Sequence, residues 1–111
     1  MRIISETRLK RFWQANPQQA RSRKSLIQWL AQSKAAAWKS PADVKRTFGK
    51  NVDFVQSDNG SRLAVFNVYA NHYRLIAAVH YLAGHPIKGR VYVLQILTHE
   101  EYDENRWKQE L

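Results

Sequence analysis

Hydrophobic and polar positions divide the chain into a helical first half and a strand-rich second half. Between Glu6 and Phe48, apolar side chains recur every three or four positions, which is the period of an amphipathic helix. After Lys50, apolar residues come in near-continuous runs rich in β-branched and aromatic side chains, which is typical of strands. This order predicts an α+β fold, in which a layer of helices packs on one face of an antiparallel sheet.

Start and stop signals divide the first half into three helices. The first begins at Glu6. The second begins at Pro17, because Asn16 is a good N-cap and proline suits the first helical position, and it extends to about residue 36. The third begins at Pro41 by the same signal and ends before Gly49. These helices are expected to direct the following side chains toward the core: Leu9, Phe12, Trp13, Leu26, Ile27, Trp29 and Leu30.

Turn residues divide the second half into strands. Asp58-Asn59-Gly60 predicts a hairpin turn, because Asn and Gly tolerate positive φ. Thr98, with Glu101 three residues later, matches a capping box and predicts a short C-terminal helix. The strands expected between these signals cover residues 52–57, 62–69, 73–81 and 90–98, with a tight link at 70–72 and a longer loop at 82–89. Residues 2–5 have the pattern of a further short strand.

The charge of the chain points to a polyanionic partner. Its 111 residues fit one domain, 1–111, and 44% of them are hydrophobic, which is enough for a core. Lys and Arg number 18 against nine Asp and Glu, a net charge of +9, which favours binding to phosphate backbones such as RNA. An acidic protein remains an alternative, and an anionic membrane is a weaker one. Without cysteine or a long apolar run, the chain is expected to be cytoplasmic.

Cationic and aromatic side chains gather on or beside the expected strands, and they are the candidates for chemistry. They are Arg62, Asn67, Asn71, Tyr73, Arg74, Arg90, His99 and Tyr102. Such a set suits RNA cleavage without a metal: arginine can hold the phosphate and stabilise its developing charge, and histidine can exchange protons. Aromatic rings can stack on unpaired bases. Each residue also has a structural explanation, such as a solvated strand end for Arg62 and Arg90 or core packing for Tyr102.

Four segments of the second half share a pattern with a known family. They are Phe66-Asn67-Val68, the run from Asn71 to Ile76, the run from Val93 to Leu97, and the run from Thr98 to Asp103. This pattern resembles the HigB toxins of the RelE-like group, and the similarity extends from Ser40 to Asp103. The resemblance implies a compact antiparallel sheet and a ribosome-dependent messenger-RNA endonuclease that uses no metal or cofactor. It also implies a partner, the helix-turn-helix antitoxin HigA, that holds the toxin inactive.

The family's motif positions carry over to Asn67, Asn71, Tyr73, Arg74, His99 and Tyr102. On this basis Arg74 is expected to bind the scissile phosphate, His99 to exchange protons, and Tyr102 to assist or stack, while Asn67 and Asn71 shape the pocket. Two other function classes remain open. One is a catalytically inert module that binds RNA or the ribosome, and the other is a protein whose basic surface meets only an acidic partner. Cleavage of messenger RNA distinguishes the endonuclease from both of these other classes.

Overall fold

A computed structural model describes residues 1–81 and 89–111, and the expected loop at 82–89 lies outside this part except for Gly89. The predicted helices and strands are present in the predicted order. The elements are β1 (Arg2–Ile4), α1 (Glu6–Gln14), α2 (Pro17–Ala20), α3 (Arg23–Ala35), α4 (Pro41–Phe48), the 3₁₀ turn η1 (Gly49–Asn51), β2 (Val52–Gln56), β3 (Arg62–Val68), β4 (Tyr73–His80), β5 (Arg90–Thr98), α5 (His99–Asp103) and α6 (Trp107–Glu110).

The strands form one five-stranded sheet in the order β1-β5-β4-β3-β2. The predicted antiparallel arrangement is confirmed for β2 to β5. The short strand β1 pairs with β5 in parallel, so the sheet as a whole is mixed. The hairpin turn between β2 and β3 forms as expected, with Gly60 at φ 85° and its N–H donating to the carbonyl of Ser57.

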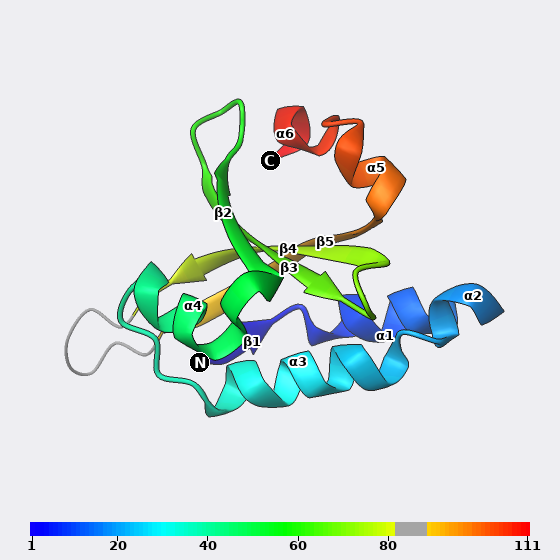
Figure 1. Cartoon of the computed structure of the whole chain (residues 1–111), viewed down its shortest axis with the longest axis horizontal. Coiled ribbons are helices and arrows are strands. Elements are labelled where there is room, and N and C mark those ends of the chain that lie inside the picture. The colour runs from blue at the N-terminus through cyan, green and yellow to red at the C-terminus, as the bar shows by residue number, and fades with distance from the viewer. Residues whose placement is uncertain (82–88) are drawn as a thin grey trace.

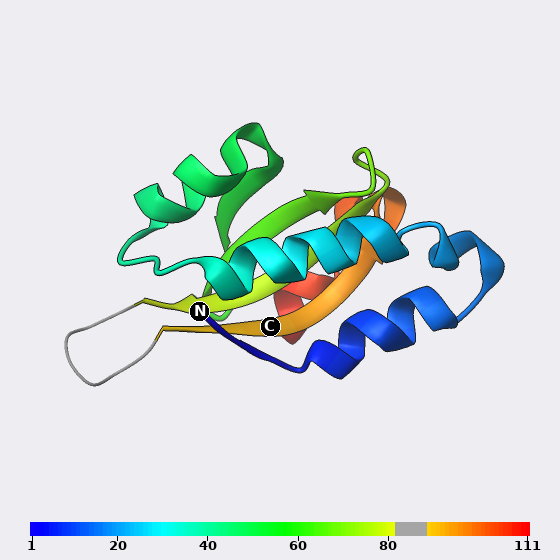
Figure 2. The ribbon, with the colours of Figure 1, turned by 90° about the horizontal axis from the view of Figure 1, so that it is seen from below.

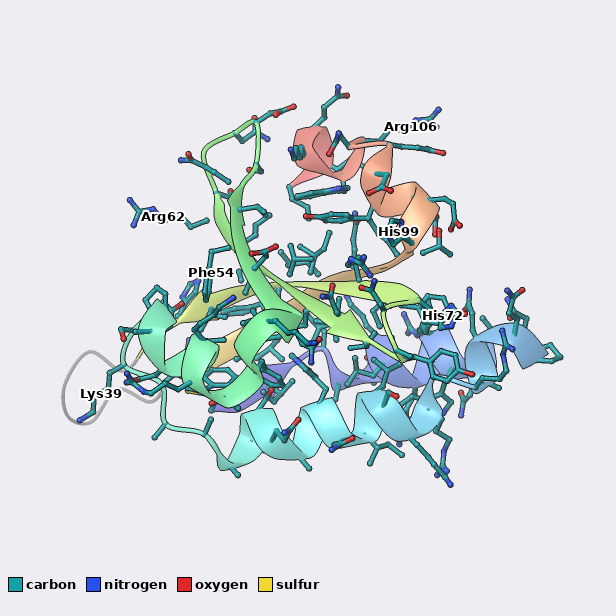
Figure 3. The ribbon with its side chains drawn as sticks, viewed as in Figure 1. Lys39, Phe54, Arg62, His72, His99 and Arg106 are labelled. Atoms are coloured by element: carbon teal, nitrogen blue, oxygen red, sulfur yellow. The ribbon has the colours of Figure 1, made fainter. Side chains whose placement is uncertain are left out.

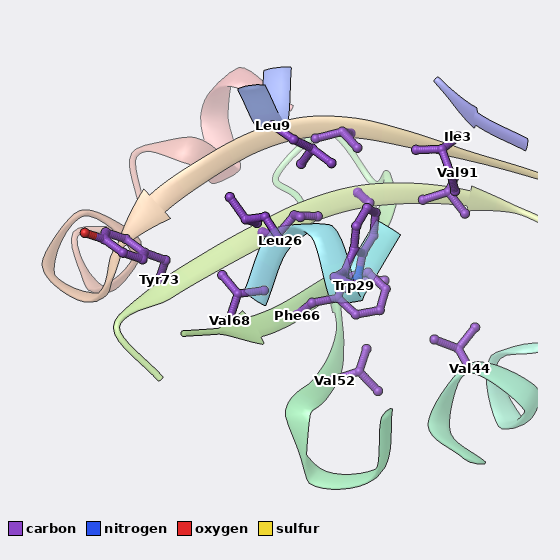
Figure 4. Close-up of a cluster of buried hydrophobic side chains, with 14 of the residues drawn as sticks. Ile3, Leu9, Leu26, Trp29, Val44, Val52, Phe66, Val68, Tyr73 and Val91 are labelled. Atoms are coloured by element: carbon purple, nitrogen blue, oxygen red, sulfur yellow. The ribbon is translucent and has the colours of Figure 1, made fainter. Parts of the chain in front are cut away.

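The predicted helical layer covers one face of the sheet, where α1 and α3 lie across the strands (Figure 2). Leu9 of α1 and Leu26 of α3 are fully buried there, and Trp29 packs edge-to-face against Phe66 of β3 with ring centroids 5.3 Å apart. Figure 4 shows these side chains meeting Val68 and Val91 from the strands. In this main core the helices cover one face of the sheet, and the opposite face remains for contacts with other parts of the chain.

Two details of the helical layer differ from the prediction. The second helix is interrupted between Ala20 and Arg23, and in the interruption the hydroxyl of the buried Ser22 donates to the carbonyl of Gln19 at 2.6 Å. Ile27 is 39% exposed rather than in the core. The buried stripe of α3 follows Leu26 and Trp29 at helical spacing, and Ile27 falls beside this stripe.

The C-terminal segment closes part of the opposite face. There, Leu63, Val65 and Ile76 form a second core with Trp107, and α5 and α6 stand above the sheet beside the β2–β3 hairpin (Figure 1). The predicted capping box is confirmed: the hydroxyl of Thr98 accepts from the Glu101 N–H, and the Glu101 carboxylate accepts from the Thr98 N–H. None of the helices in residues 1–81 and 89–111 is long and apolar enough to span a membrane.

Candidate functional site

Arg74 lies on the sheet face opposite the helical layer, at the start of β4. It shares this face with Val65 and Ile76, because side chains two residues apart on a strand, and those paired across strands, point the same way. Arg74 is only 8% exposed. Its Nη1 donates to the carbonyls of Asn71 at 2.9 Å and Tyr73 at 3.3 Å. The guanidinium is therefore held in place by backbone acceptors.

No carboxylate among the described residues forms an ion pair with Arg74. The ion pairs in the part of the chain that the structure describes all involve other residues. A cation that has lost most of its water is costly unless another charge or several hydrogen bonds compensate for it. Arg has five N–H donors, and only the Nη1 group is bound to protein here. An anion bound at this position would therefore find both an unpaired charge and free donors.

The β3–β4 turn that anchors Arg74 has an unusual backbone. Tyr69, Ala70 and Asn71 all have positive φ, at 51°, 48° and 75°. A left-handed conformation costs roughly 1–2 kcal/mol for an ordinary L-residue, so three in succession need support from their surroundings. Part of that support comes from Arg74, which bonds the carbonyl of Asn71. The turn and the arginine thus hold each other in position.

Tyr102 of α5 lies against Arg74. The Arg74 guanidinium carbon lies 5.8 Å from the Tyr102 ring centroid, a cation–π contact. A second neighbour of Tyr102 is Trp107. The ring of Trp107 stacks on that of Tyr102 with centroids 5.1 Å apart, and its indole N–H donates to the Tyr102 carbonyl at 3.0 Å. Burial raises the pKa of the Tyr102 phenol, and Asp53 raises it further against the opposing effect of Arg74. The phenol therefore stays protonated at neutral pH and can act as a donor.

His99 begins α5 next to the same turn. Its backbone N–H donates to the carbonyl of His72 at 3.2 Å, which joins the start of α5 to the β3–β4 turn. Figure 3 shows His72 and His99 at the same end of the sheet. The His99 Nδ1 lies 2.9 Å from the Asp103 carboxylate one helical turn later. This contact orients the imidazole and leaves Nε2 free on a side chain that is about half exposed.

Asn67 and Asn71 flank Arg74. Asn67 is directly opposite Arg74 in the pairing of β3 with β4, and Asn71 holds Arg74 through its carbonyl. Both residues line a cavity of about 410 Å³ with Ala70, Lys50 and Asn51. The role expected for Asn67 and Asn71, shaping the pocket, stays a prediction. Lys50 contributes a cation to the lining of this cavity.

Three of the expected substrate-binding residues lie away from this site. Tyr73 is 4% exposed and packs edge-to-face on Phe12, with ring centroids 4.9 Å apart, in the helix-covered core. The physical reason is strand alternation: because Arg74 points to one face, its neighbour Tyr73 must point to the other. The ring of Tyr73 therefore contacts Phe12 and Tyr69 on the helix-covered side rather than the group around Arg74.

Arg62 and Arg90 are at the other end of the sheet. Arg90 pairs with His80, six residues along β4 from Arg74, which is roughly 20 Å at the rise of a strand. Arg62 pairs with Gln56, and its side chain extends away from the α5 side of the molecule (Figure 3). Neither arginine joins the group around Arg74, and both are exposed strand-end charges.

The structure adds residues that the sequence did not single out. Asp53 of β2 raises the pKa of the Tyr102 phenol, and the ring of Trp107 stacks on the ring of Tyr102. Lys50 and Asn51 reach the cavity beside Asn67 from the turn after α4. The contacts of Asp53, Lys50 and Asn51 join distant segments, whereas Trp107 lies only five residues after Tyr102. The one available signal was the alternation of β2, which places Asp53 on the same face as Val65, its partner across the strand pair.

Within residues 1–81 and 89–111, no three His, Asp or Glu side chains gather in a group that could hold a metal ion. Among known families, one model matches residues 22–105 of the chain, which is more than half of its length. Its description is HigB_toxin, RelE-like toxic component of a toxin-antitoxin system. No curated protein matches the chain. The matched range includes every residue of the group around Arg74 except Trp107.

Proposed function

Because the chain belongs to the HigB family, the RelE-like toxic components of toxin–antitoxin systems, we propose that it is a ribosome-dependent endoribonuclease that cleaves messenger RNA and so inhibits translation. The observation that carries this proposal is Arg74, a largely buried guanidinium that, among residues 1–81 and 89–111, forms no ion pair and uses only Nη1 to bond protein. A phosphodiester is the anion that such a group fits, and the charge of +9 favours RNA as its source.

The proposed reaction is an attack by the 2′-hydroxyl of the substrate on the adjacent phosphorus. The bond from O2′ to phosphorus forms and the bond from phosphorus to O5′ breaks, leaving a 2′,3′-cyclic phosphate and a 5′-hydroxyl. Protonation must balance, since O2′ loses a proton and O5′ gains one. Arg74 holds the phosphate and stabilises the negative charge that develops on its oxygens in the transition state.

His99 and Tyr102 are the proposed proton-transfer groups. His99 is oriented by Asp103 through Nδ1, so its Nε2 is available to accept the proton from the 2′-hydroxyl. Tyr102 has the complementary character, because its phenol, like that of any tyrosine, carries a proton at neutral pH that it can donate to the leaving O5′ or share with a phosphate oxygen. Asn67, opposite Arg74, and Asn71 shape the pocket around the bound nucleotide. The reaction proposed here uses no metal.

The family's role also indicates an antitoxin partner. We propose that a helix-turn-helix antitoxin of the HigA type neutralises this chain, with an acidic surface that complements the excess of Lys and Arg. Binding of that kind depends on charge, so the affinity of the pair should fall as salt increases.

The test is growth of cells that express the chain, together with mapping of their transcript ends. We expect growth arrest and new messenger 5′ ends for the wild type, and loss of both for Arg74→Met, since removal of one transition-state donor typically costs about 10²–10³ in rate. Arg62→Met is the matched control because it removes the same charge at the far end of the sheet. Equal cleavage by Arg74→Met and wild type, in folded protein, would contradict the proposed role of Arg74.

A non-catalytic RNA- or ribosome-binding module is the second candidate, favoured by the exposure of His99 and by the basic segment Arg21–Lys24 at the junction of α2 and α3. It predicts growth arrest without new transcript ends. The same mapping experiment therefore separates the two functions.

A further inference from the structure

A second pocket lies beside the site, at the uncovered edge of β3. β2 pairs with β3 only as far as Phe66, so the outer edge of β3 from Asn67 onward has no strand partner. In place of a strand, α3 and the end of α4 approach this edge and enclose a pocket of about 240 Å³. Asn67 lines both this pocket and the cavity that contains Asn71 and Lys50. Asn51 lines both spaces as well, so the pocket and the cavity share two residues, and one of them, Asn67, is paired with Arg74 across the two strands.

The lining of this pocket is rich in side-chain amides and contains no charged residue. Gln28 and Gln32 come from α3, Asn51 from η1 and Asn67 from β3. The amides that do hydrogen-bond to protein, those of Asn16, Gln56 and Gln95, lie elsewhere in the described chain. Amides carry both donors and acceptors, as the edges of nucleobases do, and bidentate pairs between the two are a common means of base recognition.

Aromatic side chains complete the pocket. Trp29 lines it, is 3% exposed, and its indole Nε1 is buried without a hydrogen-bond partner. A buried donor of this kind is rare in a folded protein and marks a place where an acceptor is missing. Phe48, the last residue of α4, also lines the pocket.

Tyr69 stands at the mouth of the pocket in a conformation that an aromatic residue seldom adopts. Its φ is 51°, where glycine or asparagine would be less strained. Its ring lies 5.1 Å from the ring of His72, and the Arg21 guanidinium carbon lies 5.8 Å from its centroid. This combination of ring and cation is the kind of platform on which unpaired bases stack next to a phosphate.

We propose that this pocket binds one nucleobase of the substrate RNA, adjacent to the scissile phosphate, and so selects where the chain cleaves. The proposal rests on the proposed endoribonuclease function. The volume, below the roughly 300–1,000 Å³ typical of pockets for drug-sized ligands, suits a single base rather than two. Arg74 opposite Asn67, and Lys50 beside Asn51, supply cations for the flanking phosphates. The amides of the pocket would read the edge of the base, and Tyr69 would stack on its neighbour.

The first test measures binding without the ribosome. Each of the four nucleoside 5′-monophosphates is titrated into the ¹⁵N-labelled protein, and the indole N–H resonance of Trp29 is followed, assigned through a Trp29→Phe variant. We expect one or two of the nucleotides to shift this resonance to saturation. Gln32→Leu should weaken that binding roughly ten-fold by removing one amide from the pocket, whereas Gln14→Leu, an exposed amide on α1, should not change it. No saturable shift with any nucleotide would overturn the proposal.

The second test uses the substitution Tyr69→Gly, which removes the ring and relieves the positive φ. If Tyr69 has only a structural role, Tyr69→Gly should leave cleavage unchanged. If its ring stacks on a base, the same substitution should lower the affinity for nucleotides roughly 5- to 100-fold. Tyr69→Phe is the matched control and should retain binding. Mapping of transcript ends in cells completes the test: Gln32→Leu should relax the base preference at one position, whereas Gln14→Leu should leave the cleavage pattern of the wild type unchanged.

The outcomes separate this inference from the proposed function. If nucleotides bind at Trp29 but the wild type produces no new transcript ends, the endoribonuclease function and the selection of a cleavage site are wrong, and the pocket stands only as a nucleobase-binding site. If the wild type cleaves and the pocket variants keep its base preference unchanged, the pocket assignment is wrong and the endoribonuclease function stands.

Discussion

Trp107 is the residue on which both the C-terminal segment and the position of Tyr102 depend. Its side chain is 2% exposed, stacks on Tyr102, and donates from its indole N–H to the Tyr102 carbonyl. Trp107→Ala removes this packing, and truncation of a buried aromatic side chain typically costs about 3–5 kcal/mol. Trp107→Phe keeps most of the ring but loses the N–H donor and should cost about 1 kcal/mol. Against a typical total of about 5–15 kcal/mol, the alanine variant should be severely destabilised.

Urea denaturation followed by circular dichroism measures these costs, with an unchanged slope as the sign that one transition is being compared. Gln109→Ala, on the exposed side of α6, is the control and should stay within about 0.5 kcal/mol of wild type. If Trp107→Ala and Trp107→Phe lose the same amount, or if the alanine variant loses under about 1 kcal/mol, Trp107 does not anchor the segment. In that case the C-terminal segment would not hold Tyr102 against Arg74.

Three further outcomes follow from the site. The raised pKa of Tyr102 means that the folded state keeps the phenol proton above the unfolded value of about 10. The free energy of unfolding that this pKa shift contributes is fully present below that pH and is lost as pH rises through the folded pKa. In thermal melts, the wild type should therefore lose more stability in alkali than Tyr102→Phe. Arg62→Ala and Arg90→Ala should leave messenger cleavage within a few-fold of wild type, because both lie at the other end of the sheet; a hundred-fold loss for either would show that the substrate path includes them. Thr98→Ala should cost about 0.5–2 kcal/mol by loss of the capping box and lower activity by freeing the start of α5; a melting temperature equal to that of wild type would show that the cap is dispensable.

Local chemistry explains why much of the fold could be predicted from the sequence. Asn16, Gly60 and Thr98 each act on their own neighbours, by capping a helix or allowing positive φ, and their effects do not depend on distant segments. The alternation of the strands is equally local. The same alternation places the adjacent residues Tyr73 and Arg74 on opposite faces of β4, so only one of them can face the site.

Features that depend on distant contacts could not be predicted. The parallel pairing of β1 with β5 joins opposite ends of the chain, and the break in the second helix depends on the burial of Ser22. The candidate site likewise combines residues that the sequence motif identifies with residues that only the folded structure brings to it. The motif positions around Arg74 were found from the sequence, while Asp53, Lys50 and Trp107 became visible only once β2, η1 and α6 were placed beside them.

The chemistry of the RNA ends tests the central claim most directly. Purified protein is added to ribosomes programmed with a defined messenger, and the fragments are analysed by mass spectrometry. We predict a 2′,3′-cyclic phosphate, or its opened monophosphate, on the upstream fragment and a 5′-hydroxyl on the downstream one, with the rate reduced about 10²-fold or more by Arg74→Met. An upstream 3′-hydroxyl with a downstream 5′-phosphate, or an intact messenger in the presence of folded wild-type protein, would contradict the account.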